Sequence, residues 1–216
     1  MNDLSSAIWS VAERLRGDFR RSDYGKVILP FTVLRRLDCV LEPTRDRVLN
    51  ALPELESRPP VYVQHVLESA AGQPFFNQSR FSFSNLTHDP NQVAENVMNF
   101  IHGFSANVRE IMEYFSFAAQ VERLDRAGLL YDIVDTFARI DLHPETVDNH
   151  QMGTIFEALI RKFAEQSNDT AGDHFTPREV IKLMVNLLFV ADSAALRTEG
   201  IVGTLYDPAC GTGGML

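Results

Sequence analysis

The stretch Ile201-Val-Gly-Thr-Leu-Tyr-Asp-Pro-Ala-Cys-Gly-Thr-Gly-Gly-Met-Leu216 has the pattern of a buried strand, a glycine-rich turn and the start of a helix. Pro208 lacks the N–H that a sheet ladder needs, so we expect the strand to end near Asp207. Glycines carry no Cβ and allow a ligand to approach the backbone of the turn; they are Gly211, Gly213 and Gly214. Because the free N–H groups of the following helix would face the same turn, the stretch predicts a cradle for a small polar cofactor.

The residue types in this turn argue against two common cofactor loops. The phosphate-binding loop GxxxxGK[ST] needs a lysine, which is absent here, and this disfavours a nucleotide-hydrolysing domain. The dinucleotide fingerprint GxGxxG needs a third glycine at position 216, which is Leu216. Taken alone, the glycines are also compatible with a purely structural loop between a strand and a helix.

A second informative stretch, Gly172-Asp-His-Phe-Thr-Pro-Arg-Glu-Val180, has the signals of a helix start. Thr176 suits the N-cap, Pro177 the first helical position, and Glu179 completes a capping box. Any helix could begin in this way. A helix N-terminus nevertheless offers free N–H groups and a partial positive charge, which suit the carboxylate of a ligand. His174 alone is better explained as a polar loop residue.

Length and composition are those of an ordinary globular protein. The chain has 216 residues, of which 45% are hydrophobic and 23% charged, enough for one large domain or two small ones. It has no apolar run of the roughly 18 residues that span a bilayer, and its start lacks a signal-peptide pattern, so we expect a cytoplasmic location. The two cysteines, Cys39 and Cys210, lack metal-ligand spacing and are expected to be reduced and inert.

The charge of the chain is unevenly distributed. The net charge is −9, but residues 1–50 carry 9 Arg or Lys and 7 Asp or Glu, a net of +2. Either these cations form a solvated helix face beside acidic neighbours, or they form a surface that meets phosphate or an acidic partner. The overall acidity argues against tight, autonomous DNA binding. The early arginines are Arg14, Arg16, Arg20, Arg21, Arg35, Arg36, Arg45 and Arg47.

Apolar residues at helical spacing predict an all-helical domain over residues 1–142. We expect a helix capped by Ser5 or Ser6, and a second one from Ser22–Asp23 with a kink or a fresh start at Pro30. Further helices are expected over 61–71, from Asp89, over 108–115, over 124–137 with a possible break at Gly128, and over 150–162. Residues 72–84 are expected to form a loop or a small hairpin whose phenylalanines fill the core. The His143-Pro144-Glu145-Thr146 segment predicts a domain boundary.

The two stretches together resemble the methylation subunit of type I restriction-modification systems, an adenine-N6 DNA methyltransferase. Asp207-Pro-Ala-Cys-Gly-Thr-Gly-Gly214 is similar to that family's first cofactor motif, Asp-Pro-x-x-Gly-[Ser/Thr]-Gly. The Phe175-Thr-Pro-Arg178 sequence precedes it by about thirty residues, as a corresponding loop does in the family. Three further segments are similar to segments of the family, namely Val27–Leu37, Met152–Ala164 and Ala171–Gly172.

This resemblance implies a mainly α fold, in which the helical N-terminal domain, 1–142, is followed by the truncated beginning of a Rossmann-like methyltransferase domain, 143–216, with its first strand and glycine loop only. It implies S-adenosyl-L-methionine as cofactor and no metal. The residues expected to line the cofactor's amino acid end are Asp173, His174, Phe175, Thr176, Pro177 and Arg178. Those expected on the opposite wall are Asp207, Gly211, Thr212, Gly213 and Gly214.

The implied function is site-specific methyl transfer from S-adenosylmethionine to adenine in DNA. The family's catalytic motif, Asn-Pro-Pro-[Phe/Tyr], is absent from the sequence, so no residue can be given a catalytic role and we expect the fragment alone to be inactive. The implied partners are a DNA-specificity subunit, a second methylation subunit, a restriction subunit as a further candidate, and DNA in the assembled complex, with no membrane. The alternative is a non-catalytic helical module that docks a DNA-specificity subunit.

Overall fold

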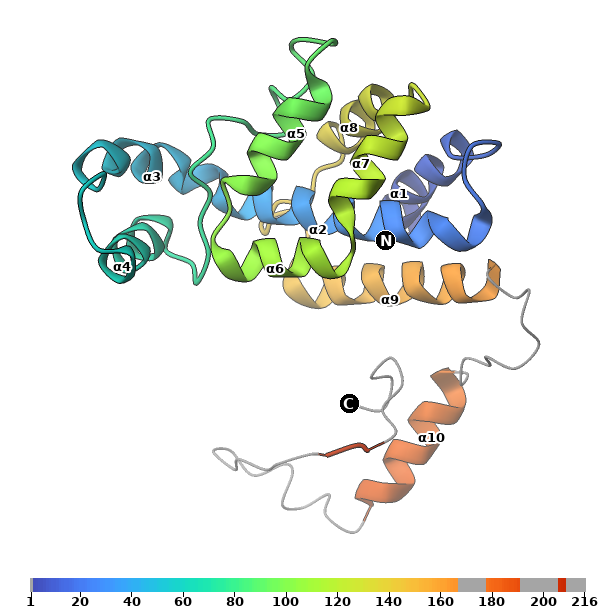
Figure 1. The fold of residues 1–216 in the computed structure, drawn as a ribbon. Helices are drawn as coiled ribbons and strands as arrows, with labels where there is room; N and C mark the ends of the chain where they lie inside the picture. The colour runs from blue at the N-terminus through green and yellow to red at the C-terminus, as the bar shows by residue number, and fades with distance from the viewer. Residues whose placement is uncertain (1, 167–177, 191–205, 209–216) are drawn as a thin grey trace. The chain divides into compact units, whose positions relative to one another are not determined.

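The computed structural model describes residues 2–166, 178–190 and 206–208. The regular secondary structure within these ranges is helical. In this part of the chain no strand forms, apart from two isolated bridges, 16 with 19 and 77 with 104. The chain divides into two units, Met1–Ser167 and Asn168–Leu216. The helices of the first unit are α1 (Asn2–Arg14), α2 (Tyr24–Leu41), α3 (Arg45–Ala51), α4 (Pro60–Ala71), α5 (Val93–His102), α6 (Ala106–Tyr114), α7 (Phe117–Arg126), α8 (Leu130–Ala138) and α9 (Asn149–Gln166) (Figure 1).

The central element of the first unit is α2, which contacts α1, α7, α8 and α9 (Figure 1). Because α2 has neighbours on several sides, its buried residues are not confined to one narrow stripe. Of the two alternatives expected at Pro30, the fresh start is wrong, since α2 runs through this residue, and the kink stays a prediction. Proline removes one backbone hydrogen bond, but buried packing of Val27, Phe31 and Leu34 around it favours the continuous helix.

Other helix boundaries also differ from those expected. The helix α1 begins at Asn2, so Ser5 and Ser6 lie inside it and neither is its N-cap. The turn from Asp89 precedes α5, which begins only at Val93. The helix α3 was not expected from the sequence; it has 7 residues and lies between two short 3-10 turns, Glu42–Thr44 and Leu52–Glu54.

Several expectations are confirmed. The break at Gly128 separates α7 from α8, and this glycine has φ +70°, a left-handed conformation that disfavours side chains. The helix expected over 150–162 is α9, whose Met152, Ile155 and Leu159 are buried. Residues 72–84 form irregular backbone rather than a hairpin, and Phe76 and Phe83 from this loop are buried in the core.

Aromatic rings form the centre of the core around α2. The Phe31 ring lies stacked on Phe137 of α8, with 5.3 Å between centroids, and edge-on to Phe117 of α7 at 4.8 Å. A second group runs from Phe83 through Phe100 to Phe104, with centroids 5.8 and 5.0 Å apart. Such edge-to-face and offset contacts add to the free energy gained by burial of the rings.

The second unit contributes α10 (Arg178–Phe189) and residues 206–208, which are irregular. The expected strand over 201–206 lies outside the described residues except for Tyr206. Several apolar side chains of α10 are at least 40% exposed in this structure: Val180, Leu183, Met184, Leu187 and Leu188. Within the described residues, no helix combines the length and the hydropathy that a membrane span requires.

Replacing Phe31 with alanine tests the aromatic centre. The side chain is 1% exposed, so Phe31→Ala should lower the free energy of unfolding by about 3–5 kcal/mol, the usual cost of a large buried cavity. Urea denaturation followed by circular dichroism measures the change. The control is Tyr114→Ala, since Tyr114 is 81% exposed and its loss should change the same quantity by less than about 0.5 kcal/mol. Equal effects of the two substitutions would contradict the assignment of Phe31 to the core.

Candidate functional site

Most of the residues predicted to bind the cofactor lie outside the described part of the chain. This applies to Asp173, His174, Phe175, Thr176, Pro177, Gly211, Thr212, Gly213 and Gly214. Of the remaining two, Arg178 is the first residue of α10 and Asp207 is a half-buried residue in irregular backbone. The cofactor site therefore stays a prediction.

The described part of α10 begins one residue after Pro177, the first helical position that the sequence predicts, and the predicted cap, Thr176, and Pro177 itself lie outside the described residues. The helix begins at Arg178, directly after Thr176-Pro177 in the sequence. The first turn of an α-helix leaves four backbone N–H groups without intrahelical partners. Its N-terminus therefore has the chemistry to receive a carboxylate, which is the end of the cofactor that the Phe-Thr-Pro-Arg stretch was predicted to hold.

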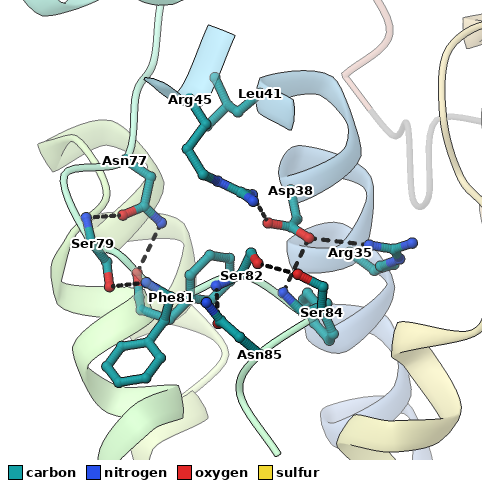
Figure 2. A network of polar contacts seen from close by, with 12 residues as sticks. Arg35, Asp38, Leu41, Arg45, Asn77, Ser79, Phe81, Ser82, Ser84 and Asn85 are labelled. Atoms are coloured by element: carbon teal, nitrogen blue, oxygen red, sulfur yellow. Dashed lines mark hydrogen bonds and ion pairs between the residues drawn. The ribbon is translucent and has the colours of Figure 1, made fainter. Parts of the chain in front are cut away.

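The first unit contains a buried polar cluster around Asp38, which was not expected from the sequence (Figure 2). The Asp38 carboxylate accepts hydrogen bonds from the guanidinium groups of Arg35, at 3.1 Å, and Arg45. It also accepts one from the backbone N–H of Phe83, at 3.2 Å. A single carboxylate thus joins α2, α3 and the loop before α5.

The loop of residues 77–85 is shaped by short-range hydrogen bonds from small polar side chains (Figure 2). Asn77 accepts from the Ser79 N–H at 2.8 Å and donates to the Phe100 carbonyl at 3.0 Å, while Asn85 accepts from the Ser82 N–H at 2.8 Å. The loop packs closely against Gly103, and a glycine is required at this position because a Cβ would overlap the side chains of Asn77 and Ser79. These bonds place the Phe83 N–H at the Asp38 carboxylate.

The Asp38 cluster has the properties of a structural centre. Burial raises the pKa of Asp38, and Arg45, the Phe83 N–H and Arg35 oppose this rise. A cavity of about 10 Å³ adjoins the carboxylate and is too small for a cofactor. Among the described residues, no group of His, Cys, Asp and Glu side chains could hold a metal ion. The cluster therefore binds protein segments together and offers no room for substrate.

A second buried charge, the guanidinium of Arg36, anchors the segment between α8 and α9. Its guanidinium donates to the carbonyls of Leu142, at 2.6 Å, and Val147, at 2.7 Å, and to the side-chain oxygen of Asn149 at 2.9 Å. Burial lowers the pKa of Arg36, which the charge of Asp148 partly offsets. The connector of residues 139–148, defined here as the segment between α8 and α9, is thereby fixed to α2.

The same connector is reinforced from within. Asp141 accepts hydrogen bonds from the His143 N–H at 2.9 Å and the Thr146 hydroxyl at 2.7 Å. These two bonds hold the pKa of Asp141 below its ordinary value, because both favour the charged carboxylate. The segment predicted as a domain boundary thus has a defined backbone path from α8 to α9.

A larger concavity lies on the surface of α5, α6 and α7. This groove has a volume of about 340 Å³; its apolar wall includes Met98, Ile101, Met112 and Phe117, and its polar lining includes His102, Arg109, Glu113 and Ser116. Ser116 precedes α7 with φ 49°, a left-handed conformation that costs free energy for a residue other than glycine.

Comparison with known proteins gives two family matches in sequence order. The model of the HsdM N-terminal domain matches residues 4–137, and the model of the N-6 DNA methylase family matches residues 147–216. The second match begins before α9, which lies in the same unit as α1–α8. A methylase-type helix therefore packs against the N-terminal helical domain. The predicted boundary between residues 142 and 143 stays a prediction.

Curated relatives agree with these matches along the whole chain. The MjaIX type I restriction enzyme methylase subunit of Methanocaldococcus jannaschii is 25% identical over 98% of this chain and 38% of that protein. The EcoKI methylase subunit of Escherichia coli K12 is 24% identical over 100% of this chain and 34% of that protein. The EcoEI methylase subunit of Escherichia coli is 31% identical over 51% of this chain and 20% of that protein. The chain thus spans less than two fifths of each of these relatives.

The fold and these matches define the class as a helical HsdM N-terminal domain followed by the start of an N-6 DNA methylase domain. Within this class, the chain belongs to the family of type I restriction-modification methylation subunits and covers the N-terminal part with the start of the methyltransferase domain. The resemblance inferred from the two stretches is confirmed at the level of the family and of the mainly helical fold.

Removing the Asp38 carboxylate should destabilise the first unit strongly. Asp38→Ala leaves Arg35 and Arg45 without their shared anion in an environment where their side chains are only 14% and 22% exposed. Breaking a buried ion pair in this way costs about 3 kcal/mol or more of unfolding free energy. Urea denaturation measures it.

The matched control for this prediction is Asp132→Ala. Asp132 lies 3.8 Å from Arg14, and the two side chains are 59% and 47% exposed. Exposed ion pairs contribute at most about 1 kcal/mol. The assigned role of Asp38 fails if its replacement costs no more than that of Asp132.

Proposed function

We propose that this chain is the N-terminal part of a subunit that transfers a methyl group from S-adenosyl-L-methionine to the N6 position of adenine in DNA at a specific site. The observation that carries the proposal is the N-6 DNA methylase match over residues 147–216, which contains both predicted cofactor stretches. The agreement with type I methylase subunits along the whole chain supports the same assignment.

The proposed cofactor contacts come from two segments. Asp173 to Arg178, including Thr176 and Pro177, would receive the amino acid end of the cofactor at the start of α10. Asp207 and the turn of Gly211, Thr212, Gly213 and Gly214 would form the opposite wall. The chain fits this ligand chemically, since a helix N-terminus favours a carboxylate and glycines allow close approach to the backbone. When bound, the cofactor supplies the methyl group.

Residues 1–216 are proposed to contribute binding and not the methyl-transfer step. They contain no Asn-Pro-Pro-aromatic sequence, which in the family holds the flipped adenine. No described residue is placed as a substitute for it. We therefore expect the isolated chain to leave DNA unmethylated.

The proposed partners are those of a multisubunit complex in the cytoplasm. They comprise a DNA-specificity subunit, a second methylation subunit, a restriction subunit as a further candidate, and DNA. An acidic chain of net charge −9 fits a subunit that leaves most of the sequence reading to another protein.

The second candidate function is a non-catalytic docking module for the DNA-specificity subunit. The groove on α5–α7 favours it, because a partly apolar concavity is the kind of surface that receives a partner side chain. The two functions differ in whether residues 1–216 bind the cofactor.

Titration calorimetry of residues 1–216 with S-adenosylmethionine tests the proposal. We expect saturable binding, and an affinity at least about tenfold lower in Gly211→Val and Thr176→Ala, because one adds a side chain to the predicted glycine turn and the other removes the predicted helix cap. The control is Gly153→Ala in α9, where an added Cβ meets no neighbouring atom and binding should be unchanged. Absence of binding by the unmodified chain would instead favour the docking module.

A further inference from the structure

The connection between α1 and α2 is a short loop with a defined shape. Gly17 has φ +101°, which permits a sharp turn, and the backbone of Arg16 pairs with that of Phe19. The Phe19 N–H donates to the Leu15 carbonyl at 3.0 Å, and Phe19 is buried. The loop therefore has a fixed backbone and one apolar anchor.

Arg123 of α7, about 100 positions further along the chain, contacts this loop and holds it in place. Its guanidinium lies over the Phe19 ring, 3.9 Å from the centroid. It also donates to the Asp18 carbonyl at 3.0 Å and to the Asp23 carboxylate at 3.3 Å. Three contacts from one planar cation fix the loop, at the cost of rotamer freedom in one side chain only.

Within the loop, Arg20 and Arg21 differ from most other arginines of the first unit. Both are exposed, and neither makes an ion pair or a side-chain hydrogen bond with any residue that the structure describes. Arg35, Arg36 and Arg45, in contrast, are used inside the protein. The basic N-terminal region thus contains buried or half-buried structural cations, exposed cations that pair with carboxylates, and exposed cations without an ion pair to any described residue. Arg20 and Arg21 belong to the last group and are adjacent in the sequence.

Residues 13–26, which contain this pair, carry five Arg or Lys and three Asp or Glu, a net of +2. Asp23 is shared by Lys26, at 3.0 Å, and Arg123, and Glu13 is paired with Arg16 at 2.9 Å. Asp18 is the remaining nearby carboxylate in the loop sequence. The chain as a whole is acidic, so this concentration of positive charge is a local feature.

A further cation extends the same side of the unit. Lys162 of α9 lies over the Trp9 ring, 4.0 Å from the ammonium nitrogen to the centroid, and remains exposed. Trp9 packs against Phe163, which in turn contacts Gly25 near the start of α2. Lys162 is therefore held by ring contacts near the end of the arginine loop, as we call the connection of residues 15–23 between α1 and α2.

We propose that Arg20 and Arg21, with Lys162 at their flank, bind the phosphodiester backbone of duplex DNA. This rests on the proposed function, and it adds the N-terminal helical domain as a DNA contact that is independent of sequence. Guanidinium groups match phosphate oxygens in geometry, and a fixed loop reduces the entropy lost on binding. The contact positions the domain on the duplex and carries no base readout.

The test compares two double variants with equal charge changes. Fluorescence anisotropy measures binding of residues 1–216 to labelled duplexes of two unrelated sequences over a series of salt concentrations starting at low salt. Arg20→Ala with Arg21→Ala should weaken binding roughly tenfold on both duplexes and lower the slope of log affinity against log salt by about two, because each arginine neutralises one phosphate. Circular dichroism should show an unchanged fold, since both side chains are exposed.

The control is Arg47→Ala with Arg80→Ala. Both residues are exposed and without an ion pair to any described residue, and α3, which holds Arg47, lies at the other end of the helical unit from the arginine loop (Figure 1). This variant should keep the wild-type salt slope. Equal losses in the two variants would mean a nonspecific charge effect and would overturn the proposal, as would no binding by the unmodified chain at low salt.

Failure of this inference is separable from failure of the proposed function. Calorimetry with S-adenosylmethionine is run on the same loop variant, which should bind the cofactor as the unmodified chain does. Cofactor binding with DNA affinity independent of Arg20 and Arg21 overturns the DNA contact alone. Loop-dependent DNA binding by a chain that does not bind cofactor supports the contact and contradicts the proposed function.

Discussion

The hydrogen bonds from the Arg36 guanidinium to the Leu142 and Val147 carbonyls are the constraint on which the arrangement of the first unit depends. A buried cation is costly to desolvate, so it is stable only where enough acceptors surround it. Here the acceptors come from the connector of residues 139–148 and from Asn149, at the start of α9. The need to satisfy one guanidinium therefore fixes the path by which the chain leaves the helical domain and enters the methylase-type helix.

Two nearby charged residues of α2 bind different segments of the chain. Arg36 binds the connector, whereas Asp38, two residues later and therefore on another face of the helix, binds Arg45 and the Phe83 N–H. Arg35 links the two groups, since it donates to the Ile140 carbonyl at 2.8 Å and to Asp38 at 3.1 Å. The central helix thus joins the two ends of the helical domain by specific polar bonds in addition to its aromatic packing.

The sequence was sufficient to predict the helical domain, because apolar residues at three- and four-residue spacing mark the buried faces of α1, α5 and α9. It was insufficient for the continuous path of α2 through Pro30, which depends on packing from several neighbours. Apolar spacing does not predict the short helix α3, because this helix has one buried residue, Val48, and hence no apolar stripe. The stretches at 173–178 and 207–214 indicated the family, which the comparisons confirm. The geometry of the cofactor site that these stretches predict stays a prediction.

The sequence does contain an indication of the polar clusters, although a search for apolar residues at helical spacing does not use it. Arg35, Arg36 and Asp38 interrupt an otherwise apolar run between Val27 and Leu41, and charged residues within a helix that is buried on several sides must find partners. Arg35 and Arg45 lie only three and seven positions from Asp38, but the other partners of these charged residues lie 45 to 113 positions away. Such long-range pairing is not recoverable from local spacing in one sequence.

The most direct test of the central claim is amide hydrogen exchange in Arg36→Ala, with Arg47→Ala, at an exposed arginine, as control. The account predicts a selective loss of protection at the connector and the first turn of α9, including the amides of Val147 and Met152, which donate to His143 and Asp148. Amides within α5 and α7 should then exchange more slowly than these. Wild-type protection at Val147 and Met152, or an equal loss in every helix, would contradict the claim that Arg36 holds the connector in place.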